Sequence, residues 1–158
     1  MPHRSRYRLG VISDTHGLLR PEAIKILEGS DLIIHAGDIG PLQILEALSR
    51  LGPVAAVRGN VDRGAGVWAL PSSEVVEVGE VRLYVLHELF TLDLDPGAAG
   101  FAGVIFGHTH EPALFHEGGV LFLNPGSAGP RRFTLPVSAA ILHVDGTELE
   151  AEIVKLKV

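Results

Sequence analysis

The stretch Leu9-Gly10-Val11-Ile12-Ser13-Asp14-Thr15-His16-Gly17 decides how the rest of the chain is organised. Its apolar beginning predicts a short buried strand. The strand ends at a carboxylate and an imidazole two residues apart. In an extended segment, residues i and i+2 project to the same side, so we expect Asp14 and His16 to converge on one point. An acid and a histidine placed together beyond a buried strand predict the first half of a metal site.

Residues 8–59 repeat the pattern of a buried strand followed by a helix. The predicted strands are Leu9–Ile12, Asp31–His35 and Val54–Val57. Pro21 and Pro41 each suit the first turn of a helix. The first helix is expected to stop at Gly29, and the second carries an apolar stripe of Ile44, Leu45, Leu48 and Leu51. Strand-helix-strand units with buried strands predict parallel pairing with right-handed crossovers.

After Pro71 the pattern becomes rich in strands joined by tight turns. The predicted strands are Glu74–Val78, Val81–Leu86, Val104–Phe106, Ala113–His116, Val120–Leu123, Val137–Val144 and Leu149–Val154. Gly79-Glu80, Gly118-Gly119 and Asp145-Gly146 predict the turns of three hairpins. Residues 92–101 are compatible with a short helix or a loop. We therefore expect one α/β domain over residues 1–158, with a β-rich second half.

The composition limits the classes of protein to which the chain can belong. Its 158 residues are 46% hydrophobic and 20% charged, which is typical of a folded globule. The absence of cysteine excludes disulfides and thiolate metal sites. The formal net charge of −6 argues against a broad nucleic-acid surface. No apolar run is long enough to span a bilayer, and no signal peptide is evident, so we expect a cytoplasmic protein without a membrane partner.

Polar side chains follow the ends of the predicted strands, where parallel strands bring their carboxyl ends to one edge. The seven candidate metal ligands are Asp14, His16, Asp38, Asn60, His87, His108 and His110. A set of nitrogen and oxygen donors without sulfur suits two divalent ions, with Mn preferred and Fe, Zn or Ni as alternatives. Two such ions roughly 3.5–4 Å apart can clamp a phosphoryl group and activate a water. Asp38, followed by the small Gly40, is the expected bridging ligand.

The motifs that contain these residues resemble the signature of calcineurin-like metallophosphoesterases, and most closely that of the YfcE-type small prokaryotic phosphodiesterases. The matching segments are Asp14-Thr15-His16, Gly37-Asp38, Gly59-Asn60-Val61-Asp62, His87 and Gly107-His108-Thr109-His110. Each segment alone is weak, but the ordered set is specific and spans nearly the whole chain. The resemblance implies a four-layer α-β-β-α sandwich, in which two mixed β-sheets are flanked by helices.

The resemblance also implies a role for each matched residue. One metal ion would be held by Asp14, His16 and His110, the other by Asn60, His87 and His108, and Asp38 would bridge them. A bridging water or hydroxide would attack phosphorus in line, which makes Asp38, Asn60 and His108 the catalytic candidates. Arg58 and Arg131 are the candidate substrate contacts, with Arg132 a weaker one, because a guanidinium can pair with two phosphate oxygens. The segment Asn124-Pro125-Gly126-Ser127 resembles a family segment near the site.

Two positions depart from the wider family. Val61 stands where many members have a histidine that protonates the leaving group, so we expect a preference for esters with good leaving groups. Glu88 stands where the family usually has glycine, which permits backbone angles that glutamate resists. The sequence therefore does not decide the geometry of the second metal site.

Other polar residues have structural explanations. His35 lies inside a strand and is expected to be a hydrogen-bonded core residue. Asp62 is expected either to stabilise a turn or to support the site. His3, His116 and His143 are expected at the surface or in packing, and Trp68 to cover the site or an oligomer interface.

Two functions from different classes fit these features. The first is a two-metal phosphodiesterase, or a phosphatase of low selectivity, that acts on a small phosphate ester. The second is a binding scaffold with the same fold, like the retromer scaffold subunit. A nuclease acting on long DNA ranks third because the chain is acidic. The family resemblance also suggests a homo-oligomer.

Overall fold

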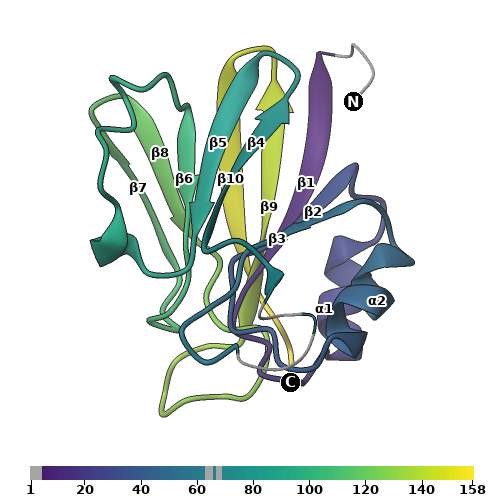
Figure 1. Ribbon diagram of the computed structural model, residues 1–158. Coiled ribbons are helices and arrows are strands. Elements are labelled where there is room, and N and C mark those ends of the chain that lie inside the picture. The colour runs from purple at the N-terminus through teal and green to yellow at the C-terminus, as the bar shows by residue number, and fades with distance from the viewer. Residues whose placement is uncertain (1–4, 63–65, 67–68) are drawn as a thin grey trace.

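Two five-stranded β-sheets stacked face to face form the body of the molecule in this computed structural model (Figure 1). The structure describes residues 5–62, 66 and 69–158. The predictions for His3 and Trp68 lie outside the described residues.

Sheet A contains the first three strands and the last two. Its order is β10 (Glu148–Lys155), β9 (Ser138–Asp145), β1 (Arg6–Ile12), β2 (Leu32–His35) and β3 (Val54–Ala56). β1, β2 and β3 are parallel, as predicted, whereas β9 runs antiparallel to both β1 and β10. The chain therefore leaves the parallel part of this sheet, builds the second sheet, and returns to complete the first.

Sheet B is built from the middle of the chain. Its order is β4 (Ser73–Val78), β5 (Val81–Leu86), β6 (Gly103–Ile105), β8 (Val120–Asn124) and β7 (Ala113–Glu117). β5, β6 and β8 are parallel, and the two edge strands are antiparallel to their neighbours. The three hairpins form at the predicted turns, and both sheets are mixed, as the family resemblance implies.

Apolar alternation along the strands produces the layers. Leu9 and Val11 of β1 pack between the sheets with residues such as Leu83 and Ile105 of sheet B. Ile12 belongs instead to the apolar layer beneath the helices. Side chains on opposite faces of one strand thus fill two separate layers of core.

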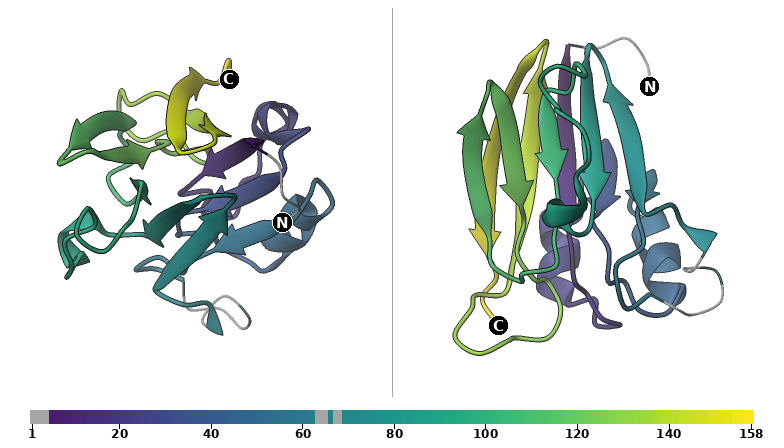
Figure 2. Two further views of the ribbon diagram at one scale, coloured as in Figure 1. Left: turned by 90° about the horizontal axis from the view of Figure 1, so that it is seen from above. Right: turned by 60° about the vertical axis from the view of Figure 1, so that its left-hand side comes forward.

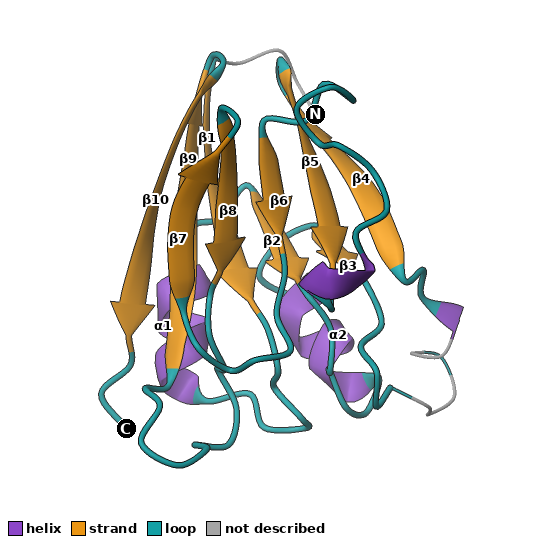
Figure 3. Ribbon diagram, turned by 90° about the vertical axis from the view of Figure 1, so that its left-hand side faces the viewer, coloured by secondary structure: helices purple, strands orange, loops and turns teal. Residues whose placement is uncertain are grey.

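The helices lie mainly on one side of the molecule. α1 (Pro21–Leu27) and α2 (Gln43–Ser49) cover the outer face of sheet A (Figure 2). α2 begins at Gln43 rather than at Pro41. On the outer face of sheet B, the described residues contain the short 3₁₀-helix η2 (Leu89–Thr91) and the turns of residues 93–100 in place of an α-helix (Figure 3). No described helix is long and apolar enough to cross a membrane.

This topology brings loops from both sheets to one end of the sandwich. β1, β2, β3, β5 and β6 all end at the lower side of Figure 1, whereas the described chain begins at the upper side. The loops after these five strands carry the seven predicted ligands.

Candidate metal centre

Asp14 lies at the centre of a cluster of polar side chains at this end of the sandwich. Its Oδ1 atom is 3.4 Å from His110 Nε2 and 3.7 Å from His16 Nε2. The two imidazole Nε2 atoms are 3.3 Å apart, and their rings are stacked. These three residues form a group whose ligand atoms could hold one metal ion. They are the three residues that the family resemblance assigns to a single ion.

A second group shares the Asp14 carboxylate. It joins Asp14 to Asp38 and His87, again with ligand atoms close enough for one metal ion. His87 Nε2 is 3.1 Å from Asp38 Oδ2 and 3.8 Å from Asp14 Oδ1. Asp38 Oδ2 is also 3.8 Å from His16 Nε2, so this carboxylate faces both groups. Asp14 and Asp38 therefore both lie between the two halves of the cluster.

Asn60 and His108 complete the cluster on the side of His87. The Asn60 Oδ1 and His108 Nδ1 atoms are 3.1 Å apart, and the His108 ring meets the His87 ring edge to face at 5.3 Å. The backbone N–H of His108 donates to Asp14 Oδ2 at 3.2 Å. The fold thus brings all seven predicted ligands into one connected cluster.

The buried atoms of this cluster fit a cation. Asp14 Oδ1 and His87 Nε2 are both buried and neither makes a hydrogen bond of good geometry, although His87 Nε2 is 3.1 Å from Asp38 Oδ2. A buried polar atom without a partner costs free energy, so two of them facing one space need an explanation. Carboxylate oxygens and imidazole nitrogens are suitable ligands for a borderline divalent ion. The residues present therefore fit the metal that the sequence predicts.

Backbone strain is concentrated at the same residues. Among the described residues, six other than glycine have positive φ: Asp14, His16, Asp38, His108, His110 and Phe133. Five of these six are predicted ligands. Such angles are unfavourable for residues with a Cβ and persist where the surroundings enforce them, often at functional sites.

Asp14 and His16 converge, but not through the extended backbone that the sequence predicts. The segment is not extended there, because φ is 56° at Asp14 and 46° at His16. Two left-handed residues bend the chain and turn both side chains toward the cluster. The convergence was predicted, but the backbone that produces it was not.

Asp62 holds two of the ligand loops together. Its buried carboxylate accepts backbone N–H groups from Ile39 and Gly40 in the loop after β2, at 2.9–3.1 Å. It also accepts the N–H of Gly59 in the loop after β3, at 2.8 Å. Of the two roles open to Asp62, the geometry favours support of the site.

His35 joins the loops after β1 and β2. Its Nδ1 accepts the N–H of Gly37 at 3.1 Å, which leaves the proton of the neutral ring on Nε2. Nε2 then donates to Thr15 Oγ1 at 3.0 Å, and Thr15 donates to the Ile39 carbonyl at 2.8 Å. His35 is a fully buried, hydrogen-bonded residue, as expected.

Asn124, at the end of β8, supports the loop of the last two histidines. Its amide nitrogen donates to the Gly107 carbonyl and to Thr109 Oγ1, both at 3.1 Å. Ser127 Oγ donates to the Asp14 carbonyl at 3.1 Å. Sequence reasoning found this segment only as a turn with a family resemblance. The signal in the sequence that could have identified its supporting role was an asparagine directly after a predicted strand.

Two glycines allow the loops to approach the carboxylates. A Cβ atom at Gly59 would collide with the Asp38 carboxylate, and one at Gly107 would collide with the Ser13 hydroxyl. Ser13 Oγ itself donates to Asp14 Oδ2 at 2.7 Å. The glycine beside each ligand motif is therefore required by close packing.

The electrostatics of the cluster favour ionised carboxylates. Burial is the largest single influence on the pKa of Asp14 and raises it, but His16, His87, Ser13 and His110 together lower it, so the net shift is downward. The pKa of Asp38 is lowered in the same way against its burial, chiefly by His87. Ionised carboxylates are the form that a metal ion requires, whereas His16 and His87, whose pKa values the same carboxylates raise, must release their protons when an ion binds.

The three candidate arginines lie at different places around the cluster. Arg58 donates through its guanidinium to the Leu70 carbonyl at 3.1 Å and lines a pocket with Asn60 and His87. Arg131 is exposed. The pKa of His110 is lowered by burial and further by the positive charge of Arg132, so this guanidinium lies within electrostatic reach of the centre.

The backbone conformation at Glu88 shows whether this position requires glycine. Its φ of −109° and ψ of 107° are those of extended backbone, which any residue adopts. The position needs no glycine, and glutamate imposes no strain beside His87.

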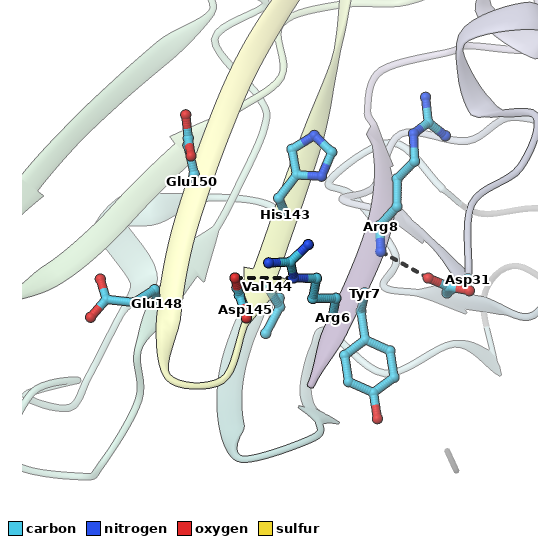
Figure 4. Close-up of a pocket in the computed structure, with 9 residues that line it drawn as sticks. All are labelled: Arg6, Tyr7, Arg8, Asp31, His143, Val144, Asp145, Glu148 and Glu150. Carbon is cyan, nitrogen blue, oxygen red and sulfur yellow. Dashed lines mark hydrogen bonds and ion pairs between the residues drawn. The ribbon is translucent and has the colours of Figure 1, made fainter. Parts of the chain in front are cut away.

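A separate pocket of about 440 Å³ lies at the other end of sheet A, where β1 begins and β9 turns into β10 (Figure 4). Its arginines are engaged by the protein itself. Arg6 pairs with Asp145 at 3.3 Å, and the Arg8 guanidinium donates to the carbonyls of Glu28 and Ile26. At the metal centre, by contrast, buried polar atoms lack hydrogen-bond partners. These contacts of the pocket's arginines include no such atom.

Comparisons with known proteins agree with this fold and cluster. The calcineurin-like phosphoesterase superfamily domain matches residues 7–147. A probable metallophosphoesterase of Methanothermobacter thermautotrophicus is 38% identical, with 93% of this chain and 91% of that protein covered. The phosphodiesterase YfcE of Escherichia coli is 27% identical, with 87% and 88% covered.

A solved structure shares the fold at lower identity. Vps29 of Entamoeba histolytica, crystallised in complex with Zn²⁺, superposes with a TM-score of 0.72 at 21% identity, with 95% of this chain and 99% of that chain covered. The fold and the cluster define a metallophosphoesterase. The chain belongs to the calcineurin-like phosphoesterase superfamily.

Proposed function

We propose that this protein is a dinuclear, metal-dependent phosphodiesterase that hydrolyses a small phosphate ester. The observation that carries the proposal is the sharing of Asp14 between two ligand groups. Two adjacent cation positions built around common carboxylates are the arrangement needed to clamp a phosphoryl group. Asp38, which faces both His16 and His87, would bridge the two ions.

The charge of the site supports an anionic substrate. Asp14 and Asp38 supply two negative charges, and the other five ligands, the Asn60 amide and four neutral imidazoles, supply none. Two divalent ions therefore leave the centre cationic, which attracts a phosphate ester. Bound ions polarise the phosphoryl oxygens and make an attacking water available near neutral pH. The water oxygen would form the new P–O bond while the ester P–O bond breaks, and the leaving group would depart as an alkoxide that takes up a proton from solvent.

The surrounding residues position the ester. His108 and Asn60, paired on the open side of the cluster, orient the phosphoryl group. Arg132 contributes positive charge beside His16 and His110, and Arg58 lies on the Asn60 side.

Val61 supplies no proton to the leaving group, so the alcohol must leave as a stable anion. The preferred metal is Mn, with Fe, Zn and Ni as alternatives.

The proposal is tested with metal-stripped protein titrated with Mn²⁺. Hydrolysis of bis(p-nitrophenyl) phosphate and the metal content per chain are measured on the same samples. We expect activity to rise as two ions bind per chain. Binding of one ion with full activity would contradict the dinuclear site.

The likeness to Vps29 supports a second candidate, a binding scaffold of the same fold. Occupied metal sites without turnover of any phosphate ester would favour it, as would a failure to bind metal. The retention of all seven ligand positions favours the enzyme.

A further inference from the structure

An exposed aromatic ring lies at the rim of the candidate metal centre. Phe90 belongs to η2, just after the loop that carries His87, and 76% of its surface is exposed. Its ring meets the His108 ring edge to face, with centroids 6.1 Å apart. A large apolar side chain so exposed beside a polar cluster is available to a ligand.

Phe90 also lines an apolar groove on the outer face of sheet B. This groove has a volume of about 490 Å³, within the range of small-molecule sites. Leu89 and Leu92 line it from the side of η2. Phe115 of β7 and Phe122 of β8 line it from the sheet, with their rings stacked 4.9 Å apart. The groove lies on the side of sheet B that faces the viewer in Figure 3, where the described residues include no α-helix.

The charges of the groove restrict what it can accept. The charged residues that line it among those described, Asp95 and Glu117, are both acidic. A second phosphate or a carboxylate would be repelled there, whereas the cationic metal centre attracts one. The occupant that fits is an uncharged, flat apolar group, because aromatic rings such as Phe90 favour stacked or edge-to-face contacts with another ring.

We propose that Phe90 and this groove bind the aromatic group of a phosphodiester whose phosphorus lies at the metal centre. This inference rests on the proposed function, because it assigns the substrate class of that same site. Phe90 lines the groove and its ring also contacts the ring of His108, so it lies where the groove meets the edge of the centre. A ring attached to phosphorus directly or through one oxygen can therefore reach Phe90. Phe90 is then a specificity-determining residue.

The test is calorimetric titration of the Mn²⁺-loaded protein with phenylphosphonate and with methylphosphonate. These probes share the phosphorus group and differ only in the ring, and neither is hydrolysed. We expect the wild type to bind phenylphosphonate roughly tenfold more tightly. Phe90→Ala should remove this preference while leaving the affinity for methylphosphonate unchanged, and Phe90→Leu should remove most of it.

Leu114→Ala is the matched control. Leu114 is 40% exposed on β7, next to Phe115 in sequence, but it does not line the groove. The control should keep the preference for the phenyl group. If both probes bind the wild type equally, or if Phe90→Ala keeps the preference, the aromatic subsite is wrong while the phosphodiesterase stands. If neither probe binds and no ester is hydrolysed, both proposals fail together.

Discussion

The Asp62 carboxylate accepts the backbone N–H of Ile39 through both of its oxygens, at 2.9 and 3.1 Å. The same buried group accepts the N–H of Gly59, so one side chain fixes the loops after β2 and β3. Asp38 immediately precedes Ile39 in the chain, and a Cβ atom at Gly59 would collide with its carboxylate. The position of the Asp38 carboxylate, the proposed bridging ligand, therefore depends on a residue that is not among the predicted ligands.

Replacing Asp62 with asparagine should loosen both loops. The amide keeps the shape of the carboxylate but places an NH₂ donor against backbone N–H donors. Hydrogen bonds to a charged group contribute about 1.5–3 kcal/mol each, so we expect a loss of about 2–4 kcal/mol in the free energy of unfolding. Urea denaturation of the metal-free protein measures this loss.

Asp145→Asn provides the matched control for Asp62. Asp145 pairs with Arg6 at the surface, and its side chain is 58% exposed. Exposed ion pairs contribute about 0–1 kcal/mol, so this variant should remain close to the wild type. Equal losses in the two variants would show that Asp62 has no special structural role.

Replacing Asp38 with asparagine should weaken both metal positions. Its Oδ2 faces His87 at 3.1 Å and His16 at 3.8 Å, and the substitution removes a negative charge from both groups. We expect fewer than two ions per chain at Mn²⁺ concentrations that saturate the wild type, and loss of most activity. Full metal content with full activity would refute the bridging assignment.

Replacing His87 with alanine should have a more local effect. His87 belongs to the group of Asp14 and Asp38 but not to that of His16 and His110. We expect the variant to lose mainly one ion per chain, measured by elemental analysis after dialysis. Loss of both ions, or of neither, would contradict the division of the ligands.

The strands could be predicted from sequence because buried parallel strands appear as short apolar runs. The cluster could be predicted because the carboxyl ends of these strands meet at one edge of the sheet, and the candidate ligands follow those ends. The apolar runs at Leu9–Ile12 and Val81–Leu86 lie within or coincide with β1 and β5. The left-handed backbone at Asp14 could not be predicted, since it is imposed by contacts with the loop after β2. The contact proposed for Phe90 could not be predicted either, because a single phenylalanine forms no pattern in a sequence.

Arg132 should contribute more to substrate binding than Arg131. The charge of Arg132 acts on the histidines of the first ligand group, and a guanidinium there can pair with phosphate oxygens. We expect Arg132→Ala to raise KM for bis(p-nitrophenyl) phosphate by about five- to tenfold, equivalent to about 1–1.4 kcal/mol. Arg131→Ala is the paired variant, and a larger effect there would reverse the assignment.

Because Val61 cannot donate a proton, the rate of ester hydrolysis should depend on the pKa of the leaving group. Val61 is exposed and has no proton to give, and its backbone N–H donates to Asp38. The rate should therefore fall as the pKa of the departing alcohol rises across a series of aryl diesters. A rate that does not depend on that pKa would reveal a proton donor elsewhere in the site.

His35 should make the stability of the metal-free protein depend on pH. Burial lowers the pKa of this imidazole from 6.5 to about 4. Between these values the unfolded chain binds a proton that the folded protein excludes, so stability falls as the pH falls through this window. The full difference corresponds to about 3 kcal/mol, present above pH 6.5 and lost by about pH 4.

His35→Gln isolates this contribution because glutamine does not titrate. Its amide can still donate to Thr15, but the Gly37 N–H loses its acceptor, so the variant should be less stable at pH 7.5 by about 1–3 kcal/mol. Urea denaturation at pH 7.5 and pH 5 compares the two proteins. The difference should shrink at pH 5, because only the wild type loses the stability that depends on a neutral imidazole. If the difference in unfolding free energy between the two proteins were the same at both pH values, His35 would have the same pKa in the folded and unfolded chains. Its hydrogen bonds to Thr15 and Gly37 would then not favour the neutral imidazole, which would contradict this prediction.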